Sequence, residues 1–170
     1  MSKRIIAQLA KAPVQGMVKT RMQPALNVEQ SQLLHQGLVE LVVASVAEYK
    51  KHDGDVHHQL WCSAEHDWFT HLSCSSEFII KAQAPGDLGQ RLASITASQL
   101  APNTSLILIG SDCPFIEPDI YSAMFEDLES GDWDLVIIPA FDGGYAALAL
   151  KEAHCELFEA IPGGGGRSCR

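Results

Sequence analysis

The sequence has 170 residues, of which 46% are hydrophobic and 19% are charged, the proportions of an ordinary globular domain. Its formal net charge of -9 argues against general binding to nucleic acid or to a membrane surface, which requires a basic face. No apolar run approaches the roughly 20 residues of a membrane span, and the apolar stretch after Lys3 and Arg4 is too short for a signal peptide. We therefore expect a cytoplasmic location, in line with five cysteines that lack CxxC pairing.

The first half of the chain alternates between strand and helix patterns. The run RIIAQLA (4–10) predicts a strand, and apolar positions at helical spacing predict a helix over 28–51 with Asn27 as its N-cap. A strand, a short helix, a strand and a longer helix are then expected at 57–63, 65–72, 77–83 and 87–100. The last of these helices has its apolar face formed by Leu88, Leu92, Ile95 and Leu100.

The second half continues the same alternation. SLILIG (105–110) is typical of a buried parallel strand, and 118–130 predicts a helix with Pro118 in its first turn. Another buried strand, a further strand and a last helix are expected at 133–140, 145–151 and 152–161. This order predicts a three-layer α/β/α sandwich with a mostly parallel central sheet, as one domain over 1–161. Residues 162–170, PGGGGRSCR, are expected to form a disordered Gly-rich tail.

Four loops that follow predicted strands are rich in Gly, Pro and Asp. We name them, in chain order, the first loop (KAPVQGMVKTR, 11–21), the second loop (QAPGDLGQR, 83–91), the third loop (GSDCP, 110–114) and the fourth loop (PAFDGGY, 139–145). Ligands of open α/β sheets bind at the carboxyl ends of the strands. All four loops are therefore candidates for one binding site.

The first loop suits an anionic ligand. Gly16 lets backbone amides approach phosphate oxygens, and the cations Lys11, Lys19 and Arg21 neutralise those oxygens. The loop is not a Walker A motif, because it lacks GKS or GKT. A solvated loop with three chance cations is the alternative.

In the third loop, Asp112 stands two residues beyond a buried strand. A carboxylate in this position suits Mg²⁺, which takes one or two carboxylates and completes its shell with water and phosphate oxygens. The alternative is that Asp112 caps the following turn, which Ser111 caps or shapes as well.

The second and fourth loops also allow two interpretations. Asp87 is a good N-cap for the helix that follows, while Gly86 and Gly89 could let the loop lie flat against a ring. Asp142 is followed by two glycines, which is a turn signal. It could also bind an acceptor hydroxyl or act as a base.

The motifs KAPxxGxVKTR, QxxGDLGxR, IGSDCPFI and PAFDGGY, in this order and spacing, resemble a bacterial glycosyltransferase-like family. That family has the glycosyltransferase-A fold, a nucleotide-diphosphosugar-transferase-like and Rossmann-like α/β domain. It is related to the guanylyltransferases for phospholactate and for the molybdenum cofactor. The resemblance spans residues 4–161. It implies a nucleotide sugar or nucleoside triphosphate as substrate, Mg²⁺ or Mn²⁺ as cofactor, and a small-molecule acceptor.

By position, the resemblance also implies roles for individual residues. Those that would contact the nucleotide are Lys11, Pro13, Gly16, Lys19, Arg21, Gly86, Asp87, Gly89 and Ser111. Asp112 would bind the metal in place of the fold's usual DxD pair, and Asp142 would lie near the acceptor. Lys19 and Arg21 would share the charge of the leaving diphosphate, and Asp142 would assist the acceptor hydroxyl.

The chain departs from the family at its end. After LFEAI (157–161) the family continues with further helices and strands and a late Asp-rich motif that gives a second metal contact, whereas PGGGGRSCR stands here. We therefore expect a C-terminally truncated form with an uncovered sheet edge, which would favour homo-oligomers. Three functions stay open: a metal-dependent glycosyl- or nucleotidyltransferase, a non-catalytic nucleotide-binding module, and an inert truncated paralogue.

Overall fold

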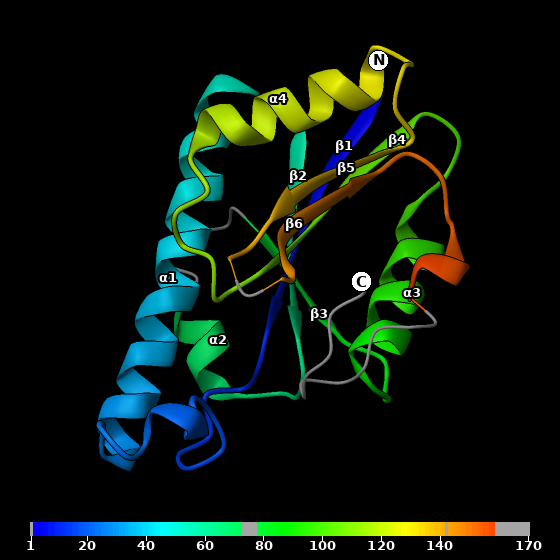
Figure 1. Ribbon diagram of the computed structural model, residues 1–170. Helices are drawn as coiled ribbons and strands as arrows, with labels where there is room; N and C mark the ends of the chain where they lie inside the picture. The colour runs from blue at the N-terminus through cyan, green and yellow to red at the C-terminus, as the bar shows by residue number, and fades with distance from the viewer. Residues whose placement is uncertain (1, 73–77, 142, 159–170) are drawn as a thin grey trace.

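A six-stranded sheet forms the middle layer of the computed structural model, which describes residues 2–72, 78–141 and 143–158 (Figure 1). The strand order is β3-β2-β1-β4-β6-β5. The strands are β1 (Lys3–Ala10), β2 (Val56–Cys62), β3 (Phe78–Ala82), β4 (Thr104–Gly110), β5 (Leu135–Pro139) and β6 (Tyr145–Leu150). Strands β1 to β4 pair in parallel, and β6 runs antiparallel to both β4 and β5. The predicted three-layer sandwich with a mostly parallel sheet is confirmed.

Helices cover both faces of this sheet. The described helices are α1 (Val28–His52), α2 (Asp67–Leu72), α3 (Leu88–Gln99) and α4 (Pro118–Glu129), with 3-10 turns η1 (Thr20–Met22) and η2 (Cys155–Phe158). Helices α1 and α4 lie on one face, and α3 lies on the other (Figure 1). Alternate residues of β4 serve the two faces: Ile107 packs with α1 and α4, while Leu106 packs with α3. In the described part of the chain, none of the helices has the length and apolar character that crossing a bilayer requires.

Short polar signals set the starts of the two helices that flank the first and second loops. Asn27 caps α1 and Asp87 caps α3, and each accepts a hydrogen bond from the backbone N–H three residues later, at 2.8 Å and 2.9 Å. The glutamines at those positions, Gln30 and Gln90, accept in return from the N-cap amides, which completes two capping boxes. The predicted N-caps are confirmed.

Three expectations about single elements need correction. Strand β5 is not fully buried as predicted for 133–140: it is the edge strand, because β6 inserts between β4 and β5, and Ile137 is 48% exposed. Leu88 is 42% exposed, although Leu92 on the same predicted face is buried. The described part of the last predicted helix is only the turn η2. Residues 159–161 and the tail 162–170 lie outside the described residues, so the tail and the truncation stay predictions.

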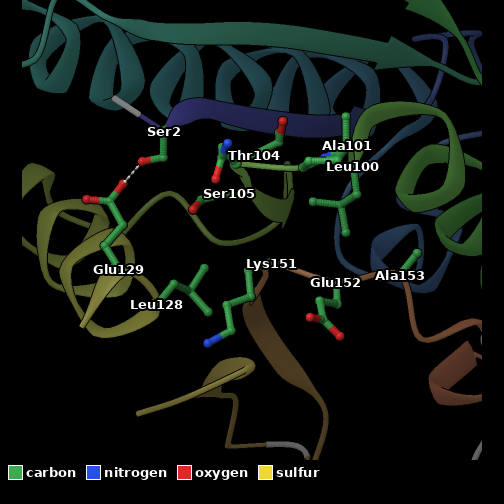
Figure 2. A pocket seen from close by; sticks show the side chains of 12 residues that line it. Ser2, Leu100, Ala101, Thr104, Ser105, Leu128, Glu129, Lys151, Glu152 and Ala153 are labelled. Atoms are coloured by element: carbon green, nitrogen blue, oxygen red, sulfur yellow. Dashed lines mark hydrogen bonds between the residues drawn. The ribbon is translucent and has the colours of Figure 1, made fainter. Parts of the chain in front are cut away.

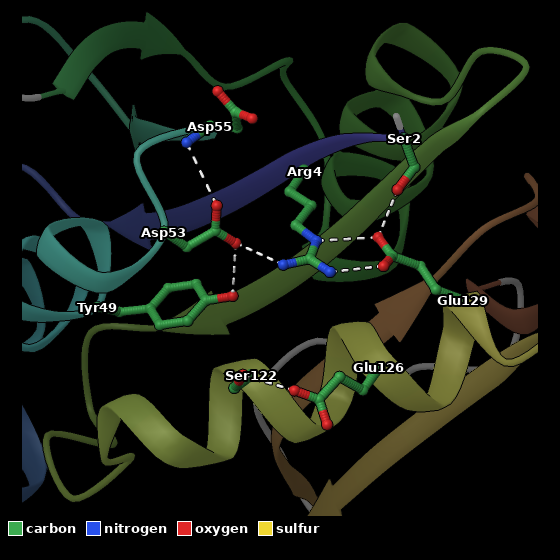
Figure 3. Close-up of polar contacts among 8 residues, drawn as sticks. All are labelled: Ser2, Arg4, Tyr49, Asp53, Asp55, Ser122, Glu126 and Glu129. Atoms are coloured by element: carbon green, nitrogen blue, oxygen red, sulfur yellow. Dashed lines mark hydrogen bonds and ion pairs between the residues drawn. The ribbon is translucent and has the colours of Figure 1, made fainter.

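Arg4, at the start of β1, joins the ends of two helices (Figure 3). Its guanidinium donates to Asp53 after α1 at 2.5 Å, and to both oxygens of Glu129 at the end of α4 at 2.9 Å and 2.5 Å. The hydroxyl of Tyr49 donates to Asp53 as well, at 3.0 Å. The hydrogen bonds with Glu129 raise the pKa of Arg4, and those from Arg4 hold the pKa of Glu129 below its usual value. This cation is therefore neutralised within the fold.

We expect Arg4→Met to lower the free energy of unfolding by about 1–3 kcal/mol at pH 7, because it leaves two partly buried carboxylates without their shared donor. A carboxylate with a lowered pKa stabilises the fold above its unfolded pKa and loses that effect as the pH falls. The difference between Arg4→Met and wild type should therefore shrink between pH 5 and pH 3. Urea unfolding across this range measures it.

The matched control is Glu48→Gln, which removes the exposed ion pair of Glu48 with Lys51 on α1. Exposed pairs of this kind contribute little to stability. Equal effects of the two substitutions would contradict the role given to Arg4.

Candidate functional site

The four loops leave the sheet at one edge. Strands β1, β3 and β4 are parallel, and β5 shares their direction because both β4 and β5 run antiparallel to β6. The first, second, third and fourth loops therefore all start at the carboxyl ends of parallel strands, as predicted. Asp142 of the fourth loop lies outside the described residues, so its role near an acceptor stays a prediction.

The first and third loops meet through one ion pair. The ammonium nitrogen of Lys19 lies 2.7 Å from Oδ1 of Asp112. The Lys19 side chain is 19% exposed and that of Asp112 is 66% exposed, so the pair lies at the surface with its carboxylate open to solvent. The two loops that the sequence predicts for phosphate and metal binding thus share one location.

The backbone of the first loop is unusual where it presents Lys19. This residue has φ 49° and ψ 35°, the left-handed conformation that residues with side chains rarely adopt. It starts the turn η1, where the N–H of Met22 donates to the Lys19 carbonyl at 2.9 Å. Gly16, with φ 80°, makes the preceding left-handed bend. Such strain persists only where the surrounding structure enforces it, and it is common at functional sites.

Polar residues of α1 hold the start of the first loop. The Nε2 atom of buried His35 donates to the carbonyl of Lys11 at 2.9 Å, and the Gln32 amide donates to the carbonyl of Pro13 at 2.6 Å. From the other side, the N–H of Ala12 donates to the hydroxyl of Ser63 at 3.0 Å. Sequence reasoning missed these anchors, although a polar residue on the buried face of a helix is a signal that could have marked them.

The second loop is tied to the first by Gln83. Its amide nitrogen donates to the carbonyl of Ala10, the residue before the first loop, at 3.3 Å. It also donates to the carbonyl of Trp61 in β2 at 2.7 Å. Arg91 donates to Gln83 at 3.2 Å and to the carbonyl of Gly86 at 2.8 Å. Gly86 has φ 124°, a conformation that favours glycine. The side chain of Arg91 therefore braces this loop from within.

Gly89 has a packing reason to be glycine. A Cβ atom at this position would lie 2.3 Å from the backbone oxygen of Phe158, far closer than atoms can approach. Helix α3 thus packs closely against η2 at this point. This close contact explains why residue 89 is glycine, and no ligand is needed for the explanation. The position of Gly89 near a base and ribose stays a prediction.

We expect Gly89→Ala to lower the free energy of unfolding by about 1–3 kcal/mol, because the added methyl group forces α3 and η2 apart. The control is Gly37→Ala in α1, where a Cβ would meet nothing within 4 Å. Alanine favours the helix over glycine by up to about 1 kcal/mol, so this variant should be stabilised. Thermal unfolding measures both. If Gly89→Ala were as stable as wild type, the close packing would be wrong.

A buried chain of polar side chains lies beneath the turn that carries Asp112. The Gln8 amide nitrogen donates to the Ser111 hydroxyl at 3.0 Å, and that hydroxyl donates to the Leu9 carbonyl at 2.8 Å. The Gln8 oxygen lies 3.1 Å from Nε2 of His58 and accepts its proton. Gln8, His58 and Ser111 are each at most 4% exposed. Ser111, expected beside the nucleotide, directs its hydroxyl inward and shapes the turn.

Sequence reasoning did not select Gln8 or His58. The available signal was Gln8 within the apolar run of β1, whereas His58 stands between two other polar residues of β2 and nothing in the sequence set it apart. Burial lowers the pKa of His58 to about 3, so its imidazole is neutral at pH 7. The neutral ring keeps one N–H, at Nε2, for the Gln8 oxygen.

This burial gives a pH signature. An unfolded histidine titrates near pH 6.5, and folded His58 titrates near pH 3, so only the unfolded state binds its proton between these values. Stability should therefore fall with decreasing pH below 6.5, with a slope from this residue of up to about 1.4 kcal/mol per pH unit. His58→Gln keeps a donor for Gln8 and should remove that contribution. Urea unfolding at pH 7 and pH 5 tests this, and identical slopes in variant and wild type would refute it.

The site offers limited support for a metal. Among residues 2–72, 78–141 and 143–158, no group of three His, Cys, Asp or Glu side chains could hold a metal ion. One exposed carboxylate, Asp112, stands beside Lys19 of the first loop. This donor set fits Mg²⁺ or Mn²⁺ that takes its other ligands from phosphate oxygens and water. Without phosphate, such an ion would have Asp112 and water as its ligands.

A hollow of about 780 Å³ lies at the opposite, amino-terminal edge of the strands (Figure 2). The residues that line it are Ser2, Leu100 to Ser105, Leu128, Glu129 and Lys151 to Ala153. Two of its charged groups are already engaged, because Lys151 lies 3.0 Å from Asp134 and Glu129 binds Arg4. The hollow shares no residue with the four loops.

Comparison with known sequences identifies the family. The model of a family described as an uncharacterized protein conserved in bacteria (DUF2064) matches residues 46–165. The chain belongs to this family. The match includes the second, third and fourth loops, and the first loop precedes it. No curated protein matches the chain.

Solved structures show the same fold. A candidate nucleotide-diphospho-sugar transferase from Desulfovibrio desulfuricans G20 has a TM-score of 0.80 at 23% identity, over 95% of this chain and 69% of that one. A nucleotidyl transferase from Methanothermobacter thermautotroptrophicus has a TM-score of 0.56 at 14% identity, over 90% and 73%. Rv0371c from Mycobacterium tuberculosis H37Rv, in complex with manganese, has a TM-score of 0.54 at 10% identity, over 95% and 78%. The protein thus has a nucleotide-diphospho-sugar transferase-like fold, and the relation to guanylyltransferases stays a prediction.

Proposed function

We propose that this protein is a metal-dependent transferase that uses a nucleotide sugar or a nucleoside triphosphate and transfers a glycosyl or nucleotidyl group to a small acceptor. The observation that carries the proposal is the contact between Lys19 and Asp112, 2.7 Å apart. It brings a phosphate-binding type of loop and a metal-binding type of carboxylate together at the carboxyl edge of the sheet. Two structures of similar fold are a candidate nucleotide-diphospho-sugar transferase and a nucleotidyl transferase, which supports the same class.

Each loop has a role in this proposal. Asp112 would hold Mg²⁺ or Mn²⁺ through its open oxygen, and the ion would supply charge neutralisation for the leaving diphosphate. Lys19 and Arg21 stabilise the same developing charge from the first loop. The second loop binds the base and ribose. That Rv0371c was solved with manganese supports the choice of ion.

The reaction is a substitution by the acceptor. A hydroxyl oxygen of the acceptor forms a bond to the anomeric carbon of the sugar, or to the α-phosphorus of the triphosphate. The bond to the leaving nucleoside diphosphate or pyrophosphate breaks, and its electron pair stays on the leaving oxygen. Asp142 takes the proton of the acceptor hydroxyl. Lys19 and Arg21 compensate the negative charge that collects on the leaving group.

A second candidate is a nucleotide-binding module without turnover. The observation that favours it is that, among the described residues, no group of three His, Cys, Asp or Glu side chains could hold a metal beside Asp112. The two functions share the binding step. Turnover of nucleotide sugars or triphosphates in the presence of Mn²⁺ distinguishes them.

The binding step is tested by a thermal-shift screen of nucleoside di- and triphosphates and nucleotide sugars, with and without Mn²⁺. We expect a compound of this set to raise the melting temperature, and Mn²⁺ to increase the shift. Asp112→Asn should weaken the Mn²⁺-dependent affinity on the order of tenfold or more, because it removes the charged ligand.

The matched control is Asp127→Asn, an exposed residue near the far end of α4 that makes the same change of charge. It should bind like wild type. If no compound shifts the melting temperature, the proposal fails, and if Asp112→Asn binds like the control, the metal role of Asp112 fails.

A further inference from the structure

The carboxylate that the proposed function assigns to the metal is already in contact with a cation. The ammonium of Lys19 lies 2.7 Å from Oδ1 of Asp112. A divalent ion bound to that carboxylate would lie within a few ångströms of this ammonium, and like charges at such a distance repel each other strongly. Metal and ammonium therefore compete for Asp112.

We propose that Lys19 is a resident counter-ion that holds Asp112 against free divalent metal and releases it when a diphosphate-bearing ligand binds. The inference rests on the proposed function, and it adds an order to the binding events. A phosphate oxygen gives Lys19 a second anionic partner, so its ammonium can leave Asp112. The metal then enters with the diphosphate, whose oxygens complete its ligand shell.

The two partners are built for such an exchange. Asp112 belongs to a turn fixed from below, because Ser111 is hydrogen-bonded to both Gln8 and the Leu9 carbonyl. Lys19 reaches it from a strained left-handed backbone position, through a flexible four-carbon side chain. The exposed fractions also suit an exchange, because the Lys19 side chain is 19% exposed and that of Asp112 is 66% exposed. The ammonium thus approaches from the protein side and leaves the carboxylate open to a ligand from solvent.

The exchange has a thermodynamic consequence. Metal and diphosphate must each strengthen the binding of the other by the same factor, because coupling is reciprocal. Part of this factor arises from direct contact between the two ligands. The remainder arises because each ligand alone must break the contact between Lys19 and Asp112, whereas the two together break it only once. Removing the ammonium should therefore strengthen free-metal binding and reduce the coupling.

The first measurement uses Mn²⁺ alone, titrated by calorimetry in a phosphate-free buffer. We expect Lys19→Ala to bind Mn²⁺ about three- to fivefold more tightly than wild type, the factor that a partly exposed ion pair allows. Lys19→Gly should do the same, and it suits the left-handed backbone, so that a fold defect in the alanine variant does not confuse the result. Lys11→Ala, which removes the same charge from the same loop, is the control and should change the affinity less.

Two further variants test whether the change in Mn²⁺ affinity arises from the charge of Lys19 and at Asp112. Lys19→Arg keeps the positive charge and should bind Mn²⁺ no more tightly than wild type. Combining Lys19→Ala with Asp112→Asn should abolish the gain, because the competition takes place at Asp112. If neither Lys19→Ala nor Lys19→Gly binds Mn²⁺ better than wild type, the inference is overturned.

The second measurement uses inorganic pyrophosphate as the probe, with and without Mn²⁺. Direct contact between Mn²⁺ and pyrophosphate is the same in wild type and Lys19→Ala, so the ratio of their coupling factors isolates the part due to Lys19. We expect a smaller coupling factor in the variant, and equal factors would refute the release step. Failure of the proposed function has a different signature: neither pyrophosphate nor any nucleotide would bind to either protein, whatever the Mn²⁺ affinities.

Discussion

The parallel pairing of β1 with β4 determines where the chemistry of this protein can lie. The two strands run side by side in register, with Leu9 opposite Gly110 at their carboxyl ends. The first loop leaves one strand and the third loop leaves the other at the same height. Lys19 and Asp112 meet because of this register, although most of the chain separates them in sequence. The central position of β1 and β4 in the sheet gives both loops a firm base.

The base of the site is polar, although the core clusters on both faces of the sheet are hydrophobic. Gln8 lies in the middle strand and connects His58 of β2 with Ser111 beyond β4, so one side chain links three neighbouring strands. Buried polar groups are costly unless they are hydrogen-bonded, and these three bond to one another and to the backbone carbonyls of Val39 and Leu9. The gain is a fixed orientation for the turn that carries Asp112. The ammonium of Lys19 thus meets a carboxylate whose turn is anchored in the core.

Local signals in the sequence predicted the fold well. Apolar runs and helical spacing located the elements, and Asn27 and Asp87 marked two helix starts correctly, because a capping box depends on residues only three apart. The order of the sheet beyond β4 was not predicted. Strand β6 lies between β4 and β5, and pairing between distant segments leaves no local pattern in the sequence. The function of single charges was harder still. Arg4 binds two carboxylates that follow it by 49 and 125 residues, which no pattern near Arg4 could reveal.

The loops of the site were predicted as a set, and their internal supports were not. Gly, Pro and Asp after apolar strands indicated the carboxyl edge correctly, since parallel strands must end there together. Many of the atoms that fix each loop come from other parts of the chain: His35 of α1 and Gln83 of the second loop hold the first loop and the strand end before it, and Phe158 packs against the second loop. Such contacts depend on the tertiary structure. The sequence alone therefore identified the candidate residues more reliably than it identified what holds them.

The position of β6 has a consequence for the evolution of the domain. Strands β5 and β6 form a hairpin that adds to the parallel sheet through β6 only, and a backbone hydrogen bond from Ala140 to Gly144 closes its tip. A hairpin tip can lengthen, shorten or change in sequence with little effect on the strands behind it. The chain can thus vary at this tip while the pairing of β1 with β4, and with it the contact between Lys19 and Asp112, stays the same.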